Sequence, residues 1–458
     1  MKGKQPKAVF FIGIGGIGMS ALARYYLANL IPVFGYDKTN SPLIDALKIE
    51  GAQITLEDVF TPKWFSFDVK EVMVIYTPAI PEDNSWLNGF KKSGNRMHKR
   101  AEALGEITRS LEGLCVAGTH GKSTTSAMLS YLLKDSNIGC NAFLGAIASN
   151  FQNNFLIDLD SKFVVVEADE YDRSFLQLSP FAAIITNMDP DHLDIYGTEE
   201  KFKEGFRQFA MKIDPSGYLL LRGGLNIPSI CKQFTYGIDG DQTDFKAIEI
   251  KETDKGAVFT LVTPSSIIPE ICIGINGQHN VENATAALAL CYLLNLNLPE
   301  IANKFSDFKG LKRRFEVVFR NDQLIYIDDY AHHPTEIMQL INSVRKMFPN
   351  YKITGVFQPH LFSRTQDFGA RFAEELSELD EVFILPIYPA REEPILGIDS
   401  TWLFQKIKNP NKHLVSKGEL LPLLREKNEG VLLTIGAGDI DRLVEPIREM
   451  LAINQSTL

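Results

Sequence analysis

The 458-residue chain is longer than one hydrophobic core supports, because single cores stop growing at roughly 250–300 residues, so two or three domains are expected. Its 47 Lys and Arg residues against 57 Asp and Glu residues give a net charge of −10 without a basic cluster, which argues against a nucleic-acid partner. No run of about 18 apolar residues lacks charge, so membrane insertion is not expected.

The five cysteines are scattered along the chain and form no C-x-x-C pair: Cys115, Cys140, Cys231, Cys272 and Cys291. This usage is typical of free thiols in a reducing compartment and predicts a cytoplasmic protein. It gives little support to a structural zinc site.

The first segment, residues 1–110, predicts a Rossmann-like α/β domain. A strand over Ala8–Ile12 leads into a glycine loop at 13–18 and a helix over Met19–Leu30, and a second strand over Pro32–Tyr36 ends at Asp37. A third strand over Glu71–Tyr76 runs into Thr77, Pro78 and Ala79. Ligands bind at the carboxyl ends of such strands.

The glycine loop has the spacing of a dinucleotide-binding fingerprint. It consists of Gly13, Gly15, Gly16 and Gly18, with Asp37 nineteen residues beyond the last glycine. Alone it would indicate NAD. The motif physically requires only a diphosphate and a ribose-like hydroxyl, so a nucleotide-diphosphate substrate fits equally well.

The second segment, residues 111–312, predicts a P-loop ATPase-like domain with a parallel sheet. Its marker is the run Val116-Ala-Gly-Thr-His-Gly-Lys-Ser-Thr-Thr125, a strand that breaks into a glycine-rich turn and opens a helix. Backbone N–H groups near Gly118 and Gly121 can hold phosphate, Lys122 can reach the β- and γ-phosphates, and Ser123 can bind Mg²⁺. The run predicts an ATP site, although it departs from the strict G-x-x-x-x-G-K-[ST] pattern.

Acidic residues follow two apolar strands of this segment. Glu167 ends the strand Phe163–Glu167 and predicts a Mg²⁺ ligand beside Ser123. The alternative is a solvated acidic strand end, which would explain Asp169, Glu170 and Asp172 without any metal, but the metal interpretation is favoured. His192 lies beyond the strand Ala183–Asn187 and is expected near the same site.

Residues 212–275 alternate like a small β meander and precede an Ala-rich helix over Val281–Leu294. Asn280 and Asn283 sit where they would ordinarily cap that helix. Arg313 and Arg314 follow at the expected domain hinge, where a guanidinium can reach a nucleotide phosphate, although a surface pair is an equal alternative.

The third segment, residues 313–458, predicts a second Rossmann-like domain. Polar runs follow three of its strands: Asp328–Pro334, Phe357–Arg364 and Ile387–Glu392. Their His, Arg and Tyr side chains favour a crevice that binds a carboxylate.

Together these runs closely resemble the Mur ligase family of peptidoglycan synthesis, nearly end to end. The order of seven motifs carries the resemblance: Gly-Ile-Gly-Gly-Ile-Gly-Met at 13–19, Ala-Gly-Thr-His-Gly-Lys at 117–122, Glu-Ala-Asp-Glu at 167–170, Asp-His-Leu-Asp at 191–194, His-Asn-Val-Glu-Asn-Ala at 279–284, Asp-Tyr-Ala-His-His-Pro at 329–334 and Phe-Gln-Pro-His at 357–360. The resemblance is strongest to the members that add L-alanine.

The resemblance implies an ATP-dependent amide ligase acting on UDP-N-acetylmuramate and L-alanine, with ATP and Mg²⁺, as a monomer or a homodimer. It implies acyl-phosphate chemistry and a domain closure that excludes water. The implied UDP-sugar residues are Gly15, Gly16, Ile17, Gly18, Asp37, Thr77, Pro78, Ala79 and Arg100. The implied ATP residues are Gly118, Thr119, His120, Gly121, Lys122, Ser123, Thr124, Asn280, Asn283, Arg314 and Asp329.

Three further sets follow from the resemblance. The alanine residues would be Tyr330, His332, His360 and Arg364. The metal ligands would be Ser123, Glu167 and His192, and the catalytic group would be Lys122, Glu167, His192, Arg314 and Asp329. Asn280 and Asn283 would then contact adenine rather than cap a helix.

The sequence departs from the family pattern at two positions. Ser123 replaces the more common Thr but keeps the hydroxyl, and Leu361 stands where some relatives have Arg, which leaves Arg364 as the principal partner of the alanine carboxylate. No match to the modified lysine of other Mur ligases is found. The choice among L-Ala, L-Ser and Gly stays open.

Three alternative functions remain open. A muropeptide-recycling ligase would add the L-Ala-γ-D-Glu-diaminopimelate tripeptide to the same UDP-sugar. An NAD(P)-dependent oxidoreductase would use the first glycine loop but leave Lys122 and Glu167 without a role. A non-catalytic regulator would bind ATP without releasing phosphate in response to an amino acid.

Overall fold

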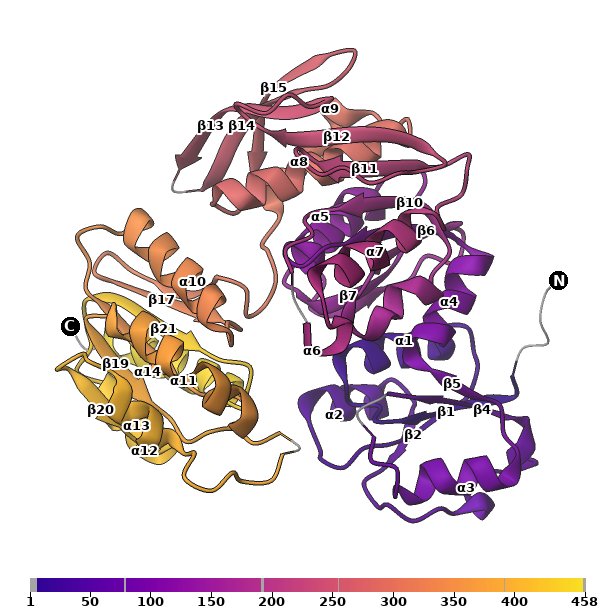
Figure 1. Ribbon diagram of the computed structural model, residues 1–458, viewed down its shortest axis with the longest axis horizontal. Coiled ribbons are helices and arrows are strands. Elements are labelled where there is room, and N and C mark those ends of the chain that lie inside the picture. Colours follow the sequence, from indigo (N-terminus) through magenta and orange to yellow (C-terminus); the bar gives the residue numbers. More distant parts are fainter. Residues whose placement is uncertain (1–5, 78–79, 191–192, 254, 391, 456–458) are drawn as a thin grey trace. The chain divides into compact units, whose positions relative to one another are not determined.

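A computed structural model describes residues 6–77, 80–190, 193–253, 255–390 and 392–455. The chain divides into two compact units, Met1–Gly310 and Leu311–Leu458. The first unit contains two sheets and the second contains one (Figure 1). Among the described residues, no helix is both long and apolar enough to cross a membrane.

The first sheet has five parallel strands in the order β3-β2-β1-β4-β5. Its strands are β1 Ala8–Ile12, β2 Val33–Tyr36, β3 Gln53–Thr55, β4 Val72–Tyr76 and β5 Met97–Lys99. Its helices are α1 Ile17–Ala28, α2 Pro42–Ile49, α3 Ser85–Ser93 and α4 Arg100–Ser110, with short 3-10 turns η1 Pro62–Trp64 and η2 Val69–Glu71. The predicted Rossmann-like pattern is confirmed.

Alternate residues of β1 face different cores. Val9 and Phe11 pack with α1, α2 and α4, whereas Ala8, Phe10 and Ile12 pack with α3 and a group of aromatic rings. Strands that are buried on both faces read as continuous apolar runs, which is why Ala8–Ile12 has no polar residue.

The central sheet has ten strands in the order β15-β14-β13-β12-β11-β10-β6-β9-β7-β8. They are β6 Glu112–Ala117, β7 Asn141–Ala148, β8 Asn153–Leu156, β9 Phe163–Glu167, β10 Pro180–Ile185, β11 Tyr218–Arg222, β12 Lys232–Ile238, β13 Phe245–Thr253, β14 Gly256–Val262 and β15 Ile267–Ile273. The helical elements are α5 Lys122–Lys134, η3 Tyr171–Gln177, α6 Leu193–Tyr196, α7 Glu199–Ala210, α8 Gln278–Leu293, α9 Leu298–Ala302 and η4 Phe305–Asp307.

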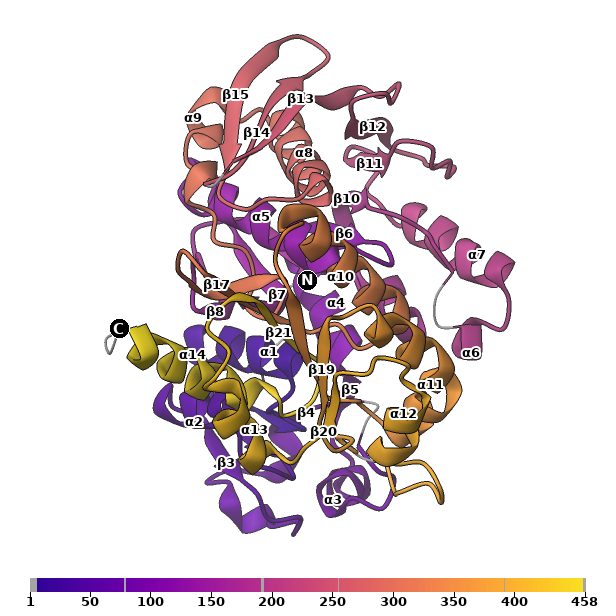
Figure 2. The same ribbon diagram turned by 90° about the vertical axis from the view of Figure 1, so that its left-hand side faces the viewer.

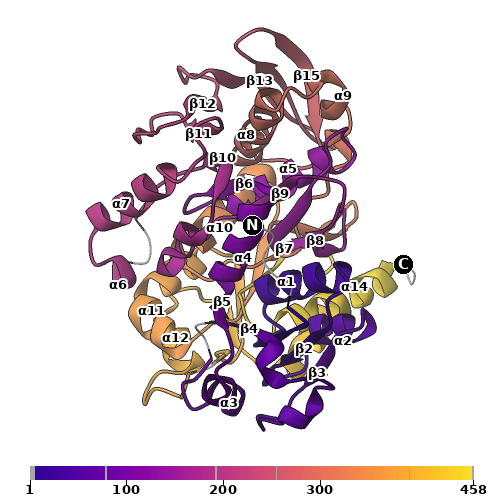
Figure 3. The same cartoon turned by 90° about the vertical axis from the view of Figure 1, so that its right-hand side faces the viewer.

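The predicted β meander is smaller than residues 212–275 and is not a separate sheet. Among the described strands of that range, β13, β14 and β15 pair antiparallel, whereas β11 and β12 extend the parallel sheet from β10. Figure 3 shows β13–β15 with α8 and α9 beside them. The predicted helix at 281–294 begins three residues earlier, at Gln278.

The two sheets of the first unit share one core and a buried polar contact. The fully buried Asn154 of β8 donates from Nδ2 to the carbonyl of Ile17 in α1 and accepts from Arg24 Nη1 at 2.9 Å. Arg24 in turn pairs with Glu50. Because a buried polar group that loses its hydrogen-bond partner costs free energy, these contacts hold α1 against the central sheet.

The second unit is a six-stranded sheet in the order β16-β17-β21-β18-β19-β20, parallel except for β16. Its strands are β16 Glu316–Arg320, β17 Leu324–Asp329, β18 Ile353–Phe357, β19 Glu381–Ile384, β20 Lys412–Leu414 and β21 Gly430–Ile435. Its helices are α10 Pro334–Met347, α11 Phe362–Ser377, α12 Ser400–Lys406, α13 Lys417–Leu424 and α14 Asp441–Gln455. Helices α10–α12 cover one face, and α13 and α14 cover the other (Figure 2).

Candidate active site

The phosphate loop lies between the carboxyl end of β6 and the first turn of α5. Gly118 has φ +133° and Gly121 has φ +81°, conformations that favour glycine. A Cβ on Gly118 would lie 2.1 Å from Thr186 Oγ1, so a side chain there would collide with the loop that follows β10. The glycines are thus required by the backbone path.

Residues after β10 brace this loop. Thr186 Oγ1 donates to the carbonyl of His120 at 2.5 Å, and Asn187 Oδ1 accepts from the His120 amide at 3.2 Å. Thr119 Oγ1 donates to the Asp189 carbonyl at 2.7 Å. The predicted ATP residues Thr119 and His120 are therefore held in place through backbone contacts, and Thr124 follows them in the first turn of α5.

Lys122 does not extend into solvent. Its Nζ lies 2.9 Å from Glu170 Oε1 and donates to the Gly118 carbonyl at 2.6 Å. Burial alone would lower the pKa of Lys122, but Glu170 and Glu167 outweigh that effect and raise the pKa, so the amine stays charged. Glu170 is 1% exposed, which excludes the alternative that it belongs to a solvated acidic strand end.

Ser123 and Glu167 meet at the same sheet edge, because β9 lies next to β6 with Val116 opposite Glu167. Ser123 Oγ donates to Glu167 Oε1 at 2.9 Å, and Glu167 Oε2 accepts from the Gly145 amide at 2.9 Å. A hydroxyl and a carboxylate are hard oxygen donors that suit Mg²⁺. The donor set therefore fits the predicted metal.

The third predicted metal ligand and catalytic residue, His192, lies outside the described residues. Within the described part of the chain, no group of three or more His, Cys, Asp and Glu side chains is arranged to hold a metal ion. The Mg²⁺ site thus stays a prediction that rests on Ser123 and Glu167.

Neither predicted adenine residue caps α8. The N-cap is Gly277, and Asn280 Nδ2 donates to the Asn276 carbonyl at 2.7 Å. Asn283 is buried on α8 and faces the phosphate loop, where a Cβ on Gly121 would lie 2.8 Å from its Oδ1. The helix cap fails as an explanation, and the structure brings Asn283 to the phosphate loop.

The first glycine loop forms a second site of the same kind. The amide of Gly15 donates to Asp37 Oδ2 at 2.8 Å, so Asp37 anchors the loop that the sequence paired it with. Gly16 is the N-cap of α1 and has no side chain, which leaves first-turn N–H groups near Ile17 and Gly18 without a side-chain cap. Uncapped N–H groups favour an anion.

Other predicted UDP-sugar residues gather at this loop because β2, β1, β4 and β5 end level with one another. A Cβ on Gly13 would lie 3.0 Å from Thr77 Cγ2, and one on Gly18 would lie 2.5 Å from Arg100 Nη1. Arg100 also pairs with Asp169 at 3.1 Å. Pro78 and Ala79 lie outside the described residues.

Arg313 and Arg314, which the sequence could not separate, have different surroundings in the second unit. Arg313 forms an ion pair with the fully buried Asp328 at 3.1 Å and donates to the Gly436 carbonyl, so it is structural. Both guanidinium groups lie over the ring of Tyr330, that of Arg313 at 5.2 Å and that of Arg314 at 5.5 Å from its centroid, so the ion pair with Asp328 is what distinguishes Arg313. Of the two arginines, Arg314 is the better candidate for binding a nucleotide phosphate.

The Asp329 carboxylate accepts hydrogen bonds from the backbone N–H groups of Phe315 at 2.7 Å and of Ala331 at 2.8 Å. Burial raises its pKa to about 6, against the opposing charge of Arg314. Arg314 and Asp329 are therefore neighbours, while their predicted contact with ATP stays a prediction.

The predicted alanine residues meet at the carboxyl ends of β17 and β18. The rings of Tyr330 and His332 lie 5.2 Å apart between centroids, those of His332 and His360 6.2 Å, and that of Tyr388 stacks 5.8 Å from His360. Arg364 Nη1 lies 3.4 Å from His360 Nδ1. Burial and Arg364 lower the pKa of His360 to about 4, and burial lowers that of His332.

Sequence reasoning missed several partners of these residues. Glu170 forms an ion pair with Lys122, and Asp169 forms one with Arg100. Glu336 accepts a hydrogen bond from the His332 backbone amide at 2.9 Å. A weak signal existed for Glu336, which stands at the third position of α10 in a capping box. No sequence signal identified the partners of Lys122 and Arg100.

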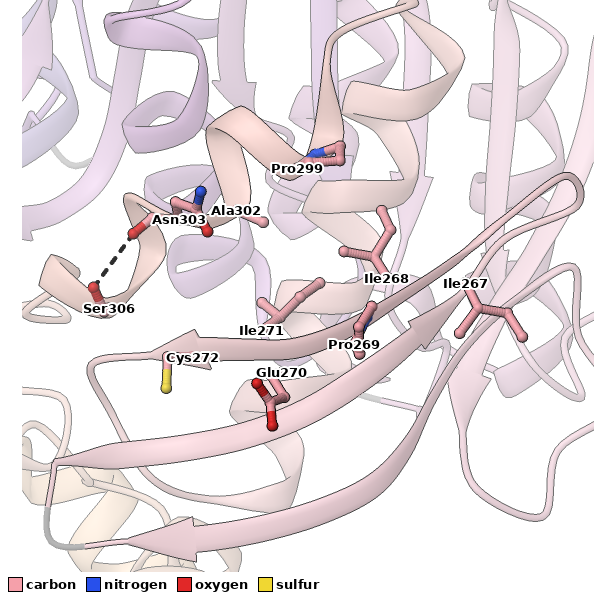
Figure 4. A pocket seen from close by; sticks show the side chains of 10 residues that line it. All are labelled: Ile267, Ile268, Pro269, Glu270, Ile271, Cys272, Pro299, Ala302, Asn303 and Ser306. Carbon is pink, nitrogen blue, oxygen red and sulfur yellow. Dashed lines mark hydrogen bonds between the residues drawn. The ribbon is translucent and has the colours of Figure 1, made fainter.

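A surface pocket lies away from these residues, between β15 and α9 (Figure 4). It is lined by residues 267–272 and by Pro299, Ala302, Asn303 and Ser306. None of these is a predicted site residue. The candidate active site is thus defined by converging strand ends rather than by this pocket.

Three family profiles match the chain in order. They are the Mur ligase family catalytic domain at residues 8–111, the Mur ligase middle domain at 116–291 and the Mur ligase glutamate ligase domain at 313–438. Each match contains one of the three sites described above.

Individual proteins are similar over almost the full length. The UDP-N-acetylmuramate--L-alanine ligase of Parabacteroides distasonis is 47% identical over 449 residues, covering 97% of each chain. That of Porphyromonas gingivalis is 48% identical over 452 residues, covering 97% of this chain and 99% of its own.

Solved structures agree. The UDP-N-acetylmuramate-alanine ligase of Thermotoga maritima superposes with a TM-score of 0.81 at 27% identity, covering 98% of this chain and 100% of its own. A murein peptide ligase from Psychrobacter arcticus has a TM-score of 0.71 at 20% identity and 99% coverage of both chains, which shows a shared fold. The chain belongs to the Mur ligase family.

Proposed function

We propose that this protein is an ATP-dependent ligase that joins L-alanine to the carboxylate of UDP-N-acetylmuramate, giving ADP and phosphate. The observation that carries the proposal is 47–48% identity, nearly end to end, to proteins named as that ligase. The site residues support it, because two glycine loops and a cluster of His and Arg side chains offer places for two phosphate-bearing substrates and one amino acid.

The proposed reaction has two steps. The γ-phosphoryl group of ATP passes to a carboxylate oxygen of the muramoyl group, which gives ADP and an acyl phosphate. The alanine amine then attacks the acyl carbon, the C–N bond forms, the C–O bond to phosphate breaks, and the amine loses a proton. Activation is necessary because a carboxylate is a poor electrophile.

The candidate site residues of the first unit each have a role in the phosphoryl transfer. Lys122 moves from Glu170 to the β- and γ-phosphates, which its charged amine stabilises. Ser123 and Glu167 would hold Mg²⁺, whose charge offsets the repulsion between a carboxylate and ATP when it is bound. The first glycine loop, Thr77 and Arg100 bind the uridine diphosphate.

The second unit binds the amino acid. Arg364 pairs with the alanine carboxylate, and His332 and His360 stay neutral at pH 7 because the pKa of each is lowered. A neutral imidazole accepts a hydrogen bond, so either histidine can orient the alanine amino group. Arg314 and Asp329 would contact the nucleotide.

The recycling ligase is the second candidate, because the fold is shared with a murein peptide ligase. The identities to the L-alanine ligases favour L-alanine. Membership of a ligase family leaves the oxidoreductase and the regulator without support. A cytoplasmic location fits a protein that consumes ATP and whose five cysteines are all free.

The deciding experiment measures phosphate release with ATP, Mg²⁺ and UDP-N-acetylmuramate, comparing L-alanine with the L-Ala-γ-D-Glu-diaminopimelate tripeptide. Release with L-alanine is expected. Release only with the tripeptide would identify the recycling enzyme, and release with neither would contradict the proposal.

A further inference from the structure

Two adjacent carboxylates connect the two glycine loops of the first unit. Asp169 Oδ2 lies 3.1 Å from Arg100 Nη2, beside the first glycine loop, and Glu170 Oε1 lies 2.9 Å from Lys122 Nζ in the phosphate loop. Each cation is one that the proposed function assigns to the phosphates of a different substrate. A segment of two residues therefore holds both.

The surroundings of Arg100 show why it needs an anion. It is the first residue of α4, and its guanidinium lies against Gly18 in the first turn of α1. Helix N-termini carry partial positive charge, so a cation at this place is repelled unless an anion neutralises it. Asp169 provides that anion here, and a diphosphate carries more charge for the same position.

The turn that follows these two carboxylates is under backbone strain. Asp172 and Arg173 have φ of +51° and +55°, a left-handed conformation that costs energy in any residue other than glycine. Contacts on either side hold it: Tyr196 OH donates to the Glu170 carbonyl at 2.7 Å, and Phe175 is fully buried. The ion pairs of Asp169 and Glu170 therefore lie directly before a strained turn.

Glu170 contacts Lys122 through one of its two carboxylate oxygens, Oε1. Glu170 Oε2 is buried and has no hydrogen-bond partner within the described part of the chain. The ion pair with Lys122 therefore depends on a single carboxylate oxygen, and a shift of the segment that frees Asp169 from Arg100 would weaken it.

We propose that Asp169 and Glu170 couple the two substrate sites, so that a phosphate-bearing ligand at the first glycine loop increases the affinity of the phosphate loop for ATP. A ligand that takes Arg100 from Asp169 relaxes the strained loop and makes Lys122 easier to withdraw from Glu170. Asp169 and Glu170 are positioning residues. The proposal rests on the proposed function, because it takes UDP-N-acetylmuramate and ATP as the ligands.

The test measures the dissociation constant of β,γ-imido-ATP with Mg²⁺, by calorimetry, in the absence and presence of saturating UDP-N-acetylmuramate. In the wild-type protein we expect binding to tighten about fivefold or more, within the usual range of coupling between sites. The reverse measurement must give the same factor, because linkage is reciprocal.

Asp169→Asn is the main variant, since this side chain is 38% exposed and the change keeps its shape. It should reduce the coupling factor to about one while both ligands still bind, and it should tighten UDP-N-acetylmuramate by itself. Glu170→Gln should also lose coupling. Asp172→Asn is the control, because it makes the same charge change in the same loop but lies 3.8 Å from Lys99 rather than near Arg100.

The outcomes separate this inference from the proposed function. Coupling that persists in Asp169→Asn, or that disappears equally in Asp172→Asn, would overturn the inference. A wild-type protein that binds both ligands independently would do the same and leave the ligase proposal standing. Failure of the wild-type protein to bind either ligand would overturn both.

Discussion

Ser123 Oγ donates a hydrogen bond of 2.9 Å to Glu167 Oε1, which joins the first turn of α5 to the end of β9. The two residues are 44 positions apart in the chain and meet because β6 and β9 are parallel neighbours. This pair of oxygens is the best-defined feature of the predicted Mg²⁺ site.

The Ser123–Glu167 pair predicts a metal phenotype. Glu167→Gln and Ser123→Ala should each raise the Mg²⁺ concentration needed for half-maximal phosphate release by about tenfold or more, since loss of even an outer-shell partner costs 10–100-fold. Ser123→Thr keeps the hydroxyl and should stay within about twofold of the wild type. An unchanged Mg²⁺ requirement in Glu167→Gln would remove this residue from the metal site, and chelation by EDTA should stop turnover.

Lys122→Ala should reduce ATP-dependent phosphate release by at least about 100-fold, because it removes the charge that stabilises the transferring phosphoryl group. UDP-N-acetylmuramate affinity, measured by calorimetry, should stay within about threefold, since that ligand is assigned to another sheet. Lys162→Ala is the matched control, because Lys162 forms an exposed ion pair with Glu112. Equal loss of both ligands would contradict the separate sites.

Gly118→Ala should disable the phosphate loop. The added Cβ would meet Thr186 Oγ1 at 2.1 Å in a backbone conformation that alanine avoids. Gly51 also has a strongly positive φ, +108°, but nothing lies within 4 Å of the Cβ it would gain, so Gly51→Ala carries a backbone cost without the clash. We expect Gly118→Ala to lose about 1–3 kcal/mol more free energy of unfolding than this control, measured by denaturant titration. Equal losses would show that the clash is relieved without cost.

His332→Ala should raise the KM for L-alanine about tenfold or more and leave the KM for ATP within about twofold, because the histidine lies among the residues assigned to the amino acid. Steady-state kinetics with each substrate varied in turn would measure this. His413→Ala removes a histidine from the far edge of the same sheet and serves as the control. If the KM for L-alanine does not change, His332 does not belong to that site.

His360 should remain neutral throughout the physiological range, since its pKa is lowered to about 4 by burial and by Arg364. Unfolding restores a pKa of about 6.5, so the unfolded chain takes up a proton first. His360 therefore opposes folding progressively as the pH falls through 6.5 towards 4. His360→Gln should flatten the loss of unfolding free energy in that interval.

The pKa of His360 can be followed directly by NMR of the imidazole. Arg364→Gln should raise it, because a nearby positive charge is removed while burial remains. A His360 resonance that titrates near pH 6.5 in the wild-type protein would contradict the buried, Arg364-facing environment.

The sequence by itself determined the elements and the edges where chemistry occurs. Apolar runs such as Ala8–Ile12 and Phe163–Val166 form strands. Glycine, Asp37, Glu167 and His360 stand at or just after the strand ends, because parallel sheets bury their strands and expose their carboxyl ends to ligands. The order of these motifs sufficed to identify the family. Local patterns encode this information, so a linear reading recovers it.

Only the tertiary structure decided which side chains meet. Asp169 reaches Arg100 across 69 positions, and Glu170 reaches Lys122 across 48, through contacts that depend on strand order, twist and the strained path of the loop after β9. The same holds for Arg313, which is fixed to the buried Asp328 while Arg314 is not. Two adjacent residues of one type have the same local signal, and they differ because the fold places the buried carboxylate of Asp328 within ion-pair distance of Arg313.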